Sequence, residues 1–340
     1  MTARQAAVVG TGLIGASTGL ALRSTGWRVV GWDPDESALA TALEGGALDA
    51  ALPSLPAAIE GAQLIVLAGP PRAVISTLGD LDTGALVIDV AGVKEPVCRA
   101  AAHLDHFVGT HPMAGREQSG PGAASGSLFR GASWVIVEDG ADSADLERVA
   151  GIVMSMGANP VRMSAAEHDL AVAIVSHLPQ VLAATLLGEA ERHDEALPLA
   201  SGSFRDLTRV ALSDPELWNE LLGENRAAVV SELRSFAERL GVIADDVESN
   251  TGVTEFLSRA RALRRTLAPP VMAVRVILED QPGELAAVGR ALAVSSVDVR
   301  DLQLRHGPQG GGGVLTLSVR PGEAEALRGA LANEGFTLGD

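Results

Sequence analysis

The stretch QAAVVGTGLIG, residues 5–15, sets a short apolar run directly against three glycines with the spacing G-x-G-x-x-G. Residues 5–10 predict a buried strand, and the apolar residues 16–24 predict a helix after the loop. In that order the first glycine permits a tight turn, the second lets a pyrophosphate approach the backbone, and the third lets helix and strand pack closely. The residues expected to hold a dinucleotide at the helix N-terminus are Gly10, Gly12, Leu13, Ile14 and Gly15.

A second predicted strand, residues 27–32, ends in Asp33. An acidic side chain at this distance from a glycine loop accepts hydrogen bonds from the adenosine ribose and repels a 2′-phosphate. We therefore expect NAD, rather than NADP, as the cofactor. A purely structural glycine-rich turn is the alternative interpretation, and the combination of strand, helix and acid argues against it.

Further short apolar runs follow at the spacing of an α/β domain. They span residues 64–68, 86–90, 107–110 and 133–137. We expect these runs to extend one largely parallel sheet, which makes residues 1–164 an α/β Rossmann-type dinucleotide-binding domain. Ligands of such sheets bind beyond the carboxyl ends of the strands, so residues that follow the runs are candidates for the site.

Two candidate catalytic residues stand directly after these runs. His111 lies in GTHPMAG, residues 109–115, where proline and glycines bracket a tight turn. An imidazole titrates near neutral pH, so His111 is the expected catalytic base, and a turn-capping role is the alternative. Lys94 is the only lysine of the chain, and we expect its compact ammonium to supply positive charge beside the same cofactor.

The composition excludes several classes of protein. The 340 residues suit two or three domains, and the formal net charge of −17 argues against a nucleic acid or an anionic membrane as partner. A single cysteine, Cys98, rules out an internal disulfide framework and a cysteine-based zinc site. The N-terminal sequence has no pattern of a signal peptide, so we expect a cytoplasmic protein.

Residues 165–268 contain apolar-periodic segments and no strand pattern, which predicts an all-helical domain that completes a substrate pocket and supplies a dimer surface. The predicted helices span residues 167–191, 216–240 and 246–267, and the first of them is expected to break at Pro179. His168 and His177 are nine residues apart and would point to opposite faces of a straight helix, so we expect no metal pair. His177 lines the pocket or is a satisfied core histidine.

Arg209 lies close to a break in the helical pattern, ahead of the helix start Ser213-Asp214-Pro215. Its planar guanidinium suits bidentate binding of a substrate carboxylate. A salt bridge to one of the nearby acids is the alternative. Beyond a proline-containing linker at residues 268–270, the pattern βαββαβ over residues 271–340 predicts a small ferredoxin-like sandwich.

Taken together, these features resemble the prephenate/arogenate dehydrogenase family of tyrosine biosynthesis over residues 1–265. The shared motifs are the glycine loop, Asp89-x-x-x-Val93-Lys94, GTHPMAG at 109–115, Glu167-His168-Asp169, Ser176-His177-Leu178-Pro179 and FRDLTRVALSDP at 204–215. The tail resembles an ACT domain, with the turn Asp280-x-Pro282-Gly283-x-Leu285. Such domains often bind amino acids, so the resemblance implies a regulatory ACT-like domain with tyrosine as a possible effector.

The resemblance implies an NAD-dependent, homodimeric prephenate dehydrogenase that removes a hydride from C4 of the substrate and releases CO2. It assigns the base to His111 and a carboxylate anchor to Arg209. Two positions depart from the family pattern: Gly92 stands where many members have serine, and Gln180 where some have a second histidine. Both belong to the expected substrate pocket with His177, and they leave arogenate open as the alternative substrate.

Two further readings compete with this one. A 3-hydroxyacid dehydrogenase shares the domain order but relies on a lysine in the helical part, where this chain has none. A non-catalytic sensor of NAD and amino acids is the reading from another class. The presence of His111 and Arg209 argues against a sensor, and Gly92 argues slightly for one.

Overall fold

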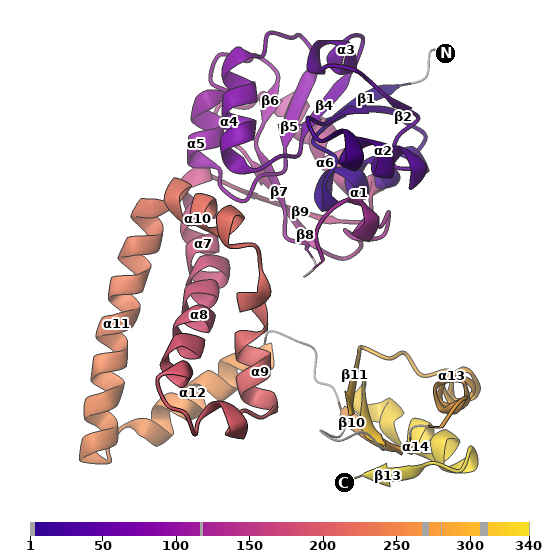
Figure 1. Cartoon of the computed structure of the whole chain (residues 1–340), viewed down its shortest axis with the longest axis vertical. Coiled ribbons are helices and arrows are strands. Elements are labelled where there is room, and N and C mark those ends of the chain that lie inside the picture. The colour runs from indigo at the N-terminus through magenta and orange to yellow at the C-terminus, as the bar shows by residue number, and fades with distance from the viewer. Residues whose placement is uncertain (1–3, 116–117, 267–271, 280, 307–311, 340) are drawn as a thin grey trace. The chain divides into compact units, whose positions relative to one another are not determined.

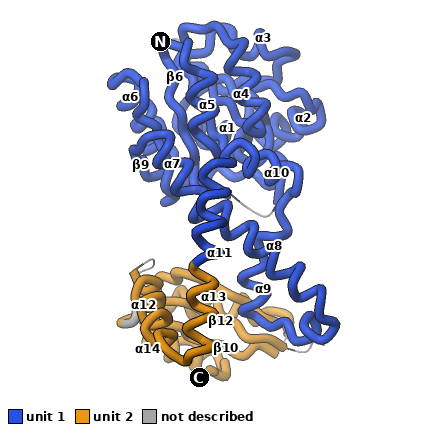
Figure 2. The backbone as a smooth tube through the Cα atoms, turned by 90° about the vertical axis from the view of Figure 1, so that its left-hand side faces the viewer, with its two compact units in different colours: residues 1–238 blue, residues 239–340 orange. Residues whose placement is uncertain are grey.

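The computed structural model describes residues 4–115, 118–266, 272–279, 281–306 and 312–339. The chain forms two compact units, residues 1–238 and 239–340, which Figure 2 distinguishes by colour. The linker expected at residues 268–270 and the turn residue Asp280 lie outside the described residues, as does part of the glycine-rich loop near residue 310.

The first unit begins with a six-stranded parallel sheet in the order β3-β2-β1-β4-β5-β6, which is the strand order of a Rossmann fold (Figure 1). The strands are β1 Gln5–Val9, β2 Arg28–Trp32, β3 Ala50–Ala51, β4 Leu64–Leu67, β5 Leu86–Asp89 and β6 Phe107–Val108. The accompanying helices are α1 Leu13–Ser24, α2 Glu36–Glu44, α3 Leu55–Ile59, α4 Pro71–Asp80, α5 Glu95–Ala100 and α6 Ser143–Ser155. The parallel sheet expected from the glycine loop and the first apolar runs is confirmed.

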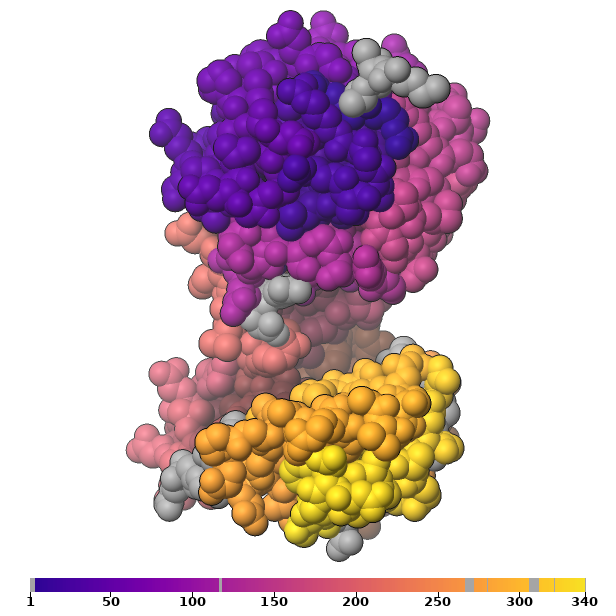
Figure 3. All heavy atoms as spheres, turned by 90° about the vertical axis from the view of Figure 1, so that its right-hand side faces the viewer, coloured from indigo at the N-terminus to yellow at the C-terminus, as the bar shows by residue number. Residues whose placement is uncertain are grey.

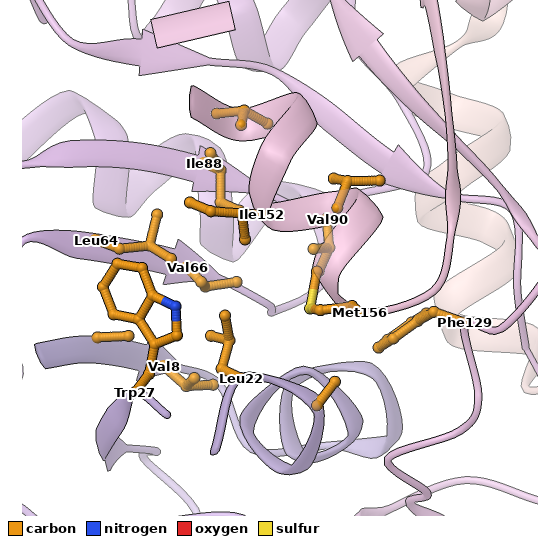
Figure 4. Packing of buried hydrophobic residues seen from close by; sticks show 14 of the residues in the cluster. Val8, Leu22, Trp27, Leu64, Val66, Ile88, Val90, Phe129, Ile152 and Met156 are labelled. Carbon is orange, nitrogen blue, oxygen red and sulfur yellow. The ribbon is translucent and has the colours of Figure 1, made fainter. Parts of the chain in front are cut away.

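Both faces of this sheet are covered, because successive side chains of a buried strand point to opposite faces. In β4, Val66 belongs to one apolar cluster and its neighbour Ile65 to another. Figure 4 shows the first cluster, in which Val66 and Ile88 pack with Leu22 of α1. The first hundred residues, indigo and violet in Figure 3, gather in one part of the unit.

A separate three-stranded sheet follows, in the order β7-β8-β9. Its strands are β7 Thr110–Pro112, β8 Ser133–Val137 and β9 Asn159–Met163; β7 and β8 are antiparallel, and β8 and β9 are parallel. The run 107–110 therefore extends the parallel sheet through β6, Phe107–Val108, whereas the expectation that the run 133–137 extends that sheet is wrong. The change of sheet occurs at Gly109, where a Cβ atom would lie 2.8 Å from the sulfur of Cys98. This close approach lets the chain leave β6 and enter β7.

A helical region follows, as the sequence predicts. Its elements in the first unit are α7 Ala165–Val172, the π-helical turn Ala173–His177, α8 Leu178–Glu191, η3 Leu197–Leu199, α9 Gly202–Thr208, η4 Arg209–Leu212 and α10 Pro215–Glu224. A short 3-10 helix, η1 Pro121–Ala123, lies earlier in the chain, before β8. Helix α11, Arg226–Ser249, spans the boundary between the units, and α12, Val253–Thr266, belongs to the second.

Three helix predictions need correction. The helix does not break at Pro179, because the π turn before it replaces the usual bonding: the N–H of Leu178 donates to Ala173, five residues earlier. This spacing relieves the conflict between a proline ring and the preceding turn. The predicted helix 216–240 is divided at Asn225. The predicted helix 246–267 is also divided, because α11 ends at Ser249 and α12 begins at Val253. Residues 165–191 are long and apolar enough to cross a membrane by length and composition alone, but they contain buried hydrogen-bonded side chains.

The C-terminal part of the second unit has the predicted order βαββαβ. Its elements are β10 Met272–Leu278, α13 Glu284–Ser295, β11 Asp301–His306, β12 Gly313–Val319, η5 Pro321–Glu323, α14 Ala324–Asn333 and β13 Thr337–Gly339. The strands form an antiparallel sheet in the order β11-β12-β10-β13. Alternate residues of β10 and β12, such as Val276 and Leu317, pack with both helices in one core.

Candidate active site

The glycine loop has the geometry that close approach of a phosphate requires. Gly10 has φ of 92°, and a Cβ on it would lie 2.6 Å from the carbonyl oxygen of Ala68. A Cβ on Gly15 would lie 1.9 Å from the carbonyl oxygen of Gly10, whereas a Cβ on Gly12 would meet no atom within 4 Å. The backbone at Gly12 is therefore open at the N-terminus of α1, where an anion is stabilised.

A cavity of about 760 Å³ adjoins this loop. Asp33, at the end of β2, lines the cavity and accepts hydrogen bonds from the Thr11 N–H at 2.5 Å and the Asp35 N–H at 2.8 Å. Asp214, the N-cap of α10, also lines it, which sequence reasoning missed because it is distant along the chain. The residues present thus fit a dinucleotide with a free ribose hydroxyl beside Asp33.

His111 lies in the middle of β7 and pairs with Val135 of β8, so the expected position in a tight turn is wrong. The pairing of β7 with β8 fixes the backbone that carries the imidazole. The preceding residue, Thr110, is fully buried, and its N–H donates to the Asp89 carboxylate at 3.0 Å. Asp89 ends β5, so this bond joins the parallel sheet to the strand of His111.

Lys94 is fully buried and does not present its ammonium to a pocket. Its Nζ donates to the carboxylate of Asp89 and, at 2.7 Å, to the backbone carbonyl of Thr110. Asp89 is also fully buried, and it accepts the N–H of Ala91 at 2.9 Å. The expected positive charge thus lies near His111, but it is paired with the buried Asp89 carboxylate and bonds the strand backbone at Thr110.

His111, His168 and Asp169 form one hydrogen-bonded chain. His111 Nδ1 is 2.8 Å from His168 Nε2, and His168 Nδ1 is 2.8 Å from Asp169 Oδ1. The Asp169 carboxylate also accepts the N–H groups of Lys94 at 2.7 Å and Glu95 at 2.8 Å. Both residues from α7 are buried. The sequence alone assigns no catalytic role to His168 or Asp169. The feature that could have indicated one is the adjacent His-Asp pair in a predicted helix.

Asn225 connects this chain to His177. Its Nδ2 donates to the backbone carbonyl of Asp169 at 2.7 Å and lies 3.2 Å from His177 Nδ1. The His177 ring also makes an edge contact with Trp218 of α10, with ring centroids 5.9 Å apart. The expected opposite orientation of His168 and His177 assumed a straight α-helix, and the π turn between them removes that premise. No cluster suited to a metal ion occurs within the described ranges.

The surroundings keep two of these histidines neutral. Desolvation lowers the pKa of His111 well below its ordinary value of 6.5, and the positive charge of Lys94 lowers it further. Burial lowers the pKa of His177 to about 4, although Asp169 opposes that shift. At neutral pH the His111 imidazole is therefore uncharged, with one ring nitrogen free to accept a proton.

Of the three remaining predicted residues, the structure places Gly92 beside this histidine network. A Cβ on Gly92 would lie 3.9 Å from His111 Nε2 and 2.9 Å from a methyl group of Leu221, so Gly92 faces the Nε2 edge. Gln180 is buried in the first turn of α8, and its Oε1 has no hydrogen-bond partner among the described residues. Arg209 begins η4, which packs against α8, and its side chain is exposed.

A dinucleotide cavity at the end of a parallel sheet, with a neutral histidine held by a following helical domain, defines a nucleotide-dependent dehydrogenase. The description "Prephenate dehydrogenase, nucleotide-binding domain" matches residues 18–162, and "Prephenate dehydrogenase, dimerization domain" matches residues 164–259. The chain belongs to the prephenate dehydrogenase family. It is an oxidoreductase of that family.

Individual relatives agree with this assignment. A probable prephenate dehydrogenase of Streptomyces niveus is 34% identical over 95% of this chain and 96% of its own length. The prephenate dehydrogenase of Bacillus subtilis is 26% identical over 92% of this chain and 91% of its own. A solved prephenate dehydrogenase structure from Aquifex aeolicus, in complex with hydroxyphenyl propionate and NAD+, superposes with a TM-score of 0.72 and 24% identity. That likeness, over 79% of this chain and 99% of the other, shows the shared fold.

Proposed function

We propose that this protein catalyses the NAD-dependent oxidative decarboxylation of prephenate to 4-hydroxyphenylpyruvate. The protein is an NAD-dependent dehydrogenase, and the observation that carries the proposal is His111, fixed on β7 and bonded to the buried His168, in a chain of this family. In the reaction the C4 hydrogen leaves as hydride while the C4 hydroxyl proton passes to His111 and C4 becomes carbonyl-like. The ring carboxylate then leaves as CO2, and the proton returns to the phenolate oxygen as the ring becomes aromatic. NAD, when bound, supplies the hydride acceptor.

The residues of this chain have separate tasks in the proposed reaction. The glycine loop and Asp33 bind the dinucleotide, since an open backbone faces the pyrophosphate and a carboxylate faces the ribose. His111 accepts the proton of the C4 hydroxyl. Arg209 anchors a substrate carboxylate, and Gln180 and His177 line the space for the substrate side chain. Lys94 has a positioning role, because its ammonium donates to the Thr110 carbonyl of β7, the strand that contains His111.

The direct test is a turnover assay with prephenate and with arogenate, each with NAD and with NADP, followed by the absorbance of the reduced nicotinamide. We expect the highest kcat/KM with prephenate and NAD. A higher value with arogenate would make the protein an arogenate dehydrogenase that forms tyrosine directly. Binding of NAD without turnover of either substrate would favour the non-catalytic sensor.

Asp33→Ala is expected to reduce the preference for NAD over NADP by about tenfold or more, because repulsion of the 2′-phosphate disappears with the carboxylate. Asp33→Asn is the matched variant, since an amide oxygen still accepts the Thr11 N–H while the charge is lost. The ratio of kcat/KM for the two cofactors measures the effect. If neither variant changes this ratio, cofactor choice depends on other residues.

Arg209→Ala is expected to raise KM about 10- to 100-fold with a smaller change in kcat, because a carboxylate anchor binds ground state and transition state alike. Arg209→Lys should recover only part of the loss, since an ammonium cannot form the bidentate pair. Arg205→Ala, from the preceding turn of α9, is the control for a general loss of positive charge. Equal effects at both positions would contradict an anchoring role for Arg209.

We also propose that residues 271–340 form an ACT-like regulatory domain with a ferredoxin-like fold, and that it binds L-tyrosine. The order βαββαβ and the antiparallel sheet support this. A cavity of about 360 Å³ lies at the N-terminus of α13, lined by Gly283, Leu285 and Leu304 among others. The N-cap Gly283 has no side chain to satisfy the first amide groups of α13, so they can receive an amino-acid carboxylate.

Leu285→Glu is expected to weaken inhibition by L-tyrosine at least about tenfold, because a carboxylate at the mouth of the cavity repels the ligand carboxylate. Val294→Glu, on the same helix and outside the cavity, is the matched control. Inhibition curves at fixed substrate measure the effect; typical allosteric coupling is about 1 to 3 kcal/mol. Unchanged inhibition of a competitive type would place tyrosine at the active site.

The proposal includes a cytoplasmic homodimer formed through the helical region. The matching family description for residues 164–259 is a dimerization domain, and large apolar side chains remain exposed there. Examples are Leu199, Leu207, Leu212, Val242 and Leu257. Exposed apolar surface of this kind favours association with a second copy. The net charge of −17 leaves nucleic acids and anionic membranes as unfavourable partners.

A further inference from the structure

We propose that His168 and Asp169 are positioning residues that fix the single proton of neutral His111 on Nδ1, so that Nε2 is the atom that takes the substrate proton. The inference deepens the proposed function and rests on it, because it names the reacting nitrogen of the proposed base. It follows from the order of donors and acceptors along the buried chain from Asp169 to His111.

The order begins at Asp169, whose carboxylate is surrounded by groups that can only donate. It accepts the N–H of Lys94 at 2.7 Å and the N–H of Glu95 at 2.8 Å. Oδ1 also lies 2.8 Å from His168 Nδ1. Since the carboxylate oxygens act as acceptors here, Nδ1 of His168 must bear a proton and donate it.

The next link is fixed by the first. In the proposed arrangement this is the only ring proton of His168, so its Nε2 carries a lone pair. That lone pair faces His111 Nδ1 at 2.8 Å, and two unprotonated nitrogens could not form this bond. Nδ1 of His111 is therefore the donor, and its Nε2 is bare. His168 is buried, so water does not compete for this position.

The bare nitrogen faces the open side of the network. Gly92 has no side chain there, and the position of its absent Cβ is 3.9 Å from Nε2. The titratable and charged groups around His111 are His168 and Asp169 from α7, His177 from the π turn, and the pair of Lys94 and Asp89. None of the hydrogen bonds described above engages Nε2, so it is the nitrogen available to the C4 hydroxyl.

The alternative is that Asp169 only anchors α7 to the start of α5, through its bonds to Lys94 and Glu95. A purely structural role predicts loss of stability but no control over the His111 proton. A neutral histidine side chain in water favours the tautomer with its proton on Nε2, the opposite of the arrangement proposed here. The tautomer of His111 therefore separates the two interpretations.

The test is long-range proton–nitrogen NMR on the full chain labelled with 15N at histidine, which contains seven such residues. We expect His111 and His168 to be protonated on Nδ1 in the unaltered protein. In His168→Leu, His111 should move largely to the Nε2-protonated form, and kcat/KM should fall about 10- to 1000-fold. His168→Gln, whose side-chain oxygen can accept the same bond, should restore the Nδ1 form in part.

His103→Gln is the matched control, because its ring bonds to the Leu81 carbonyl at 3.0 Å and is remote from this network. It should leave the His111 tautomer and the pH profile of kcat/KM unchanged, whereas His168→Leu should shift the acidic limb. A His111 protonated on Nε2 in the unaltered protein would overturn the proposal even if no variant folds. The NMR result needs no substrate, so failure of the proposed reaction would be recognised separately.

Discussion

His111→Asn is expected to lower kcat by about two to four orders of magnitude, the usual contribution of a general base, while KM changes little. The reason is that asparagine keeps a polar side chain on β7 but cannot accept the C4 hydroxyl proton. The chain of bonds through His168 also loses its terminal group. Steady-state kinetics with prephenate and NAD measure both parameters. A variant with near-normal kcat would refute His111 as the base.

The pH profile gives an independent check on the same residue. Because its pKa is lowered from 6.5, His111 stays unprotonated and active as pH falls from neutrality, and activity is lost only as pH passes below that value. We therefore expect the acidic limb of kcat/KM to lie below pH 6.5. Disappearance of this limb in His111→Asn would tie it to the imidazole, and persistence would assign it to another group.

Lys94→Met is expected to destabilise the first unit by about 3 to 5 kcal/mol, because it leaves the fully buried Asp89 carboxylate without its counter-charge. It also removes the donor to the Thr110 carbonyl, next to His111. Denaturant unfolding followed by tryptophan fluorescence measures the loss. A decrease below about 1 kcal/mol would show that Asp89 does not depend on Lys94.

The matched control is the double variant Asp89→Asn, Lys94→Met, which removes both charges. We expect it to recover part of the stability, because no uncompensated charge remains and an amide still pairs with the Thr110 N–H or the Ala91 N–H. Lys94→Arg should not substitute, since a planar guanidinium does not fit a fully buried site shaped around one ammonium. Equal stability of the single and double variants would contradict the proposed pairing.

The sequence by itself determined the parts of this protein that depend on local pattern. The glycine loop with its strand and helix predicts the parallel sheet and the dinucleotide cavity. Its glycines are needed for a positive φ or for close approach of backbone atoms that lie nearby. The order βαββαβ of the C-terminal domain is equally local, since it depends on alternation and helical periodicity. The candidate base His111 is also predicted from local pattern, because it is a histidine between proline and glycine residues directly after an apolar run.

Only the tertiary structure decided where these residues meet. At Gly109, where the sheet changes, a side chain would collide with Cys98, and the unbroken helix through Pro179 contains a π turn. No apolar pattern predicts either feature. His168 and Asp169 reach His111 across 57 residues or more of chain, so local pattern gives no indication of the bond. Lys94 points inward and pairs with the buried Asp89 carboxylate. This burial results from tertiary packing, which the spacing of residues in the sequence does not encode.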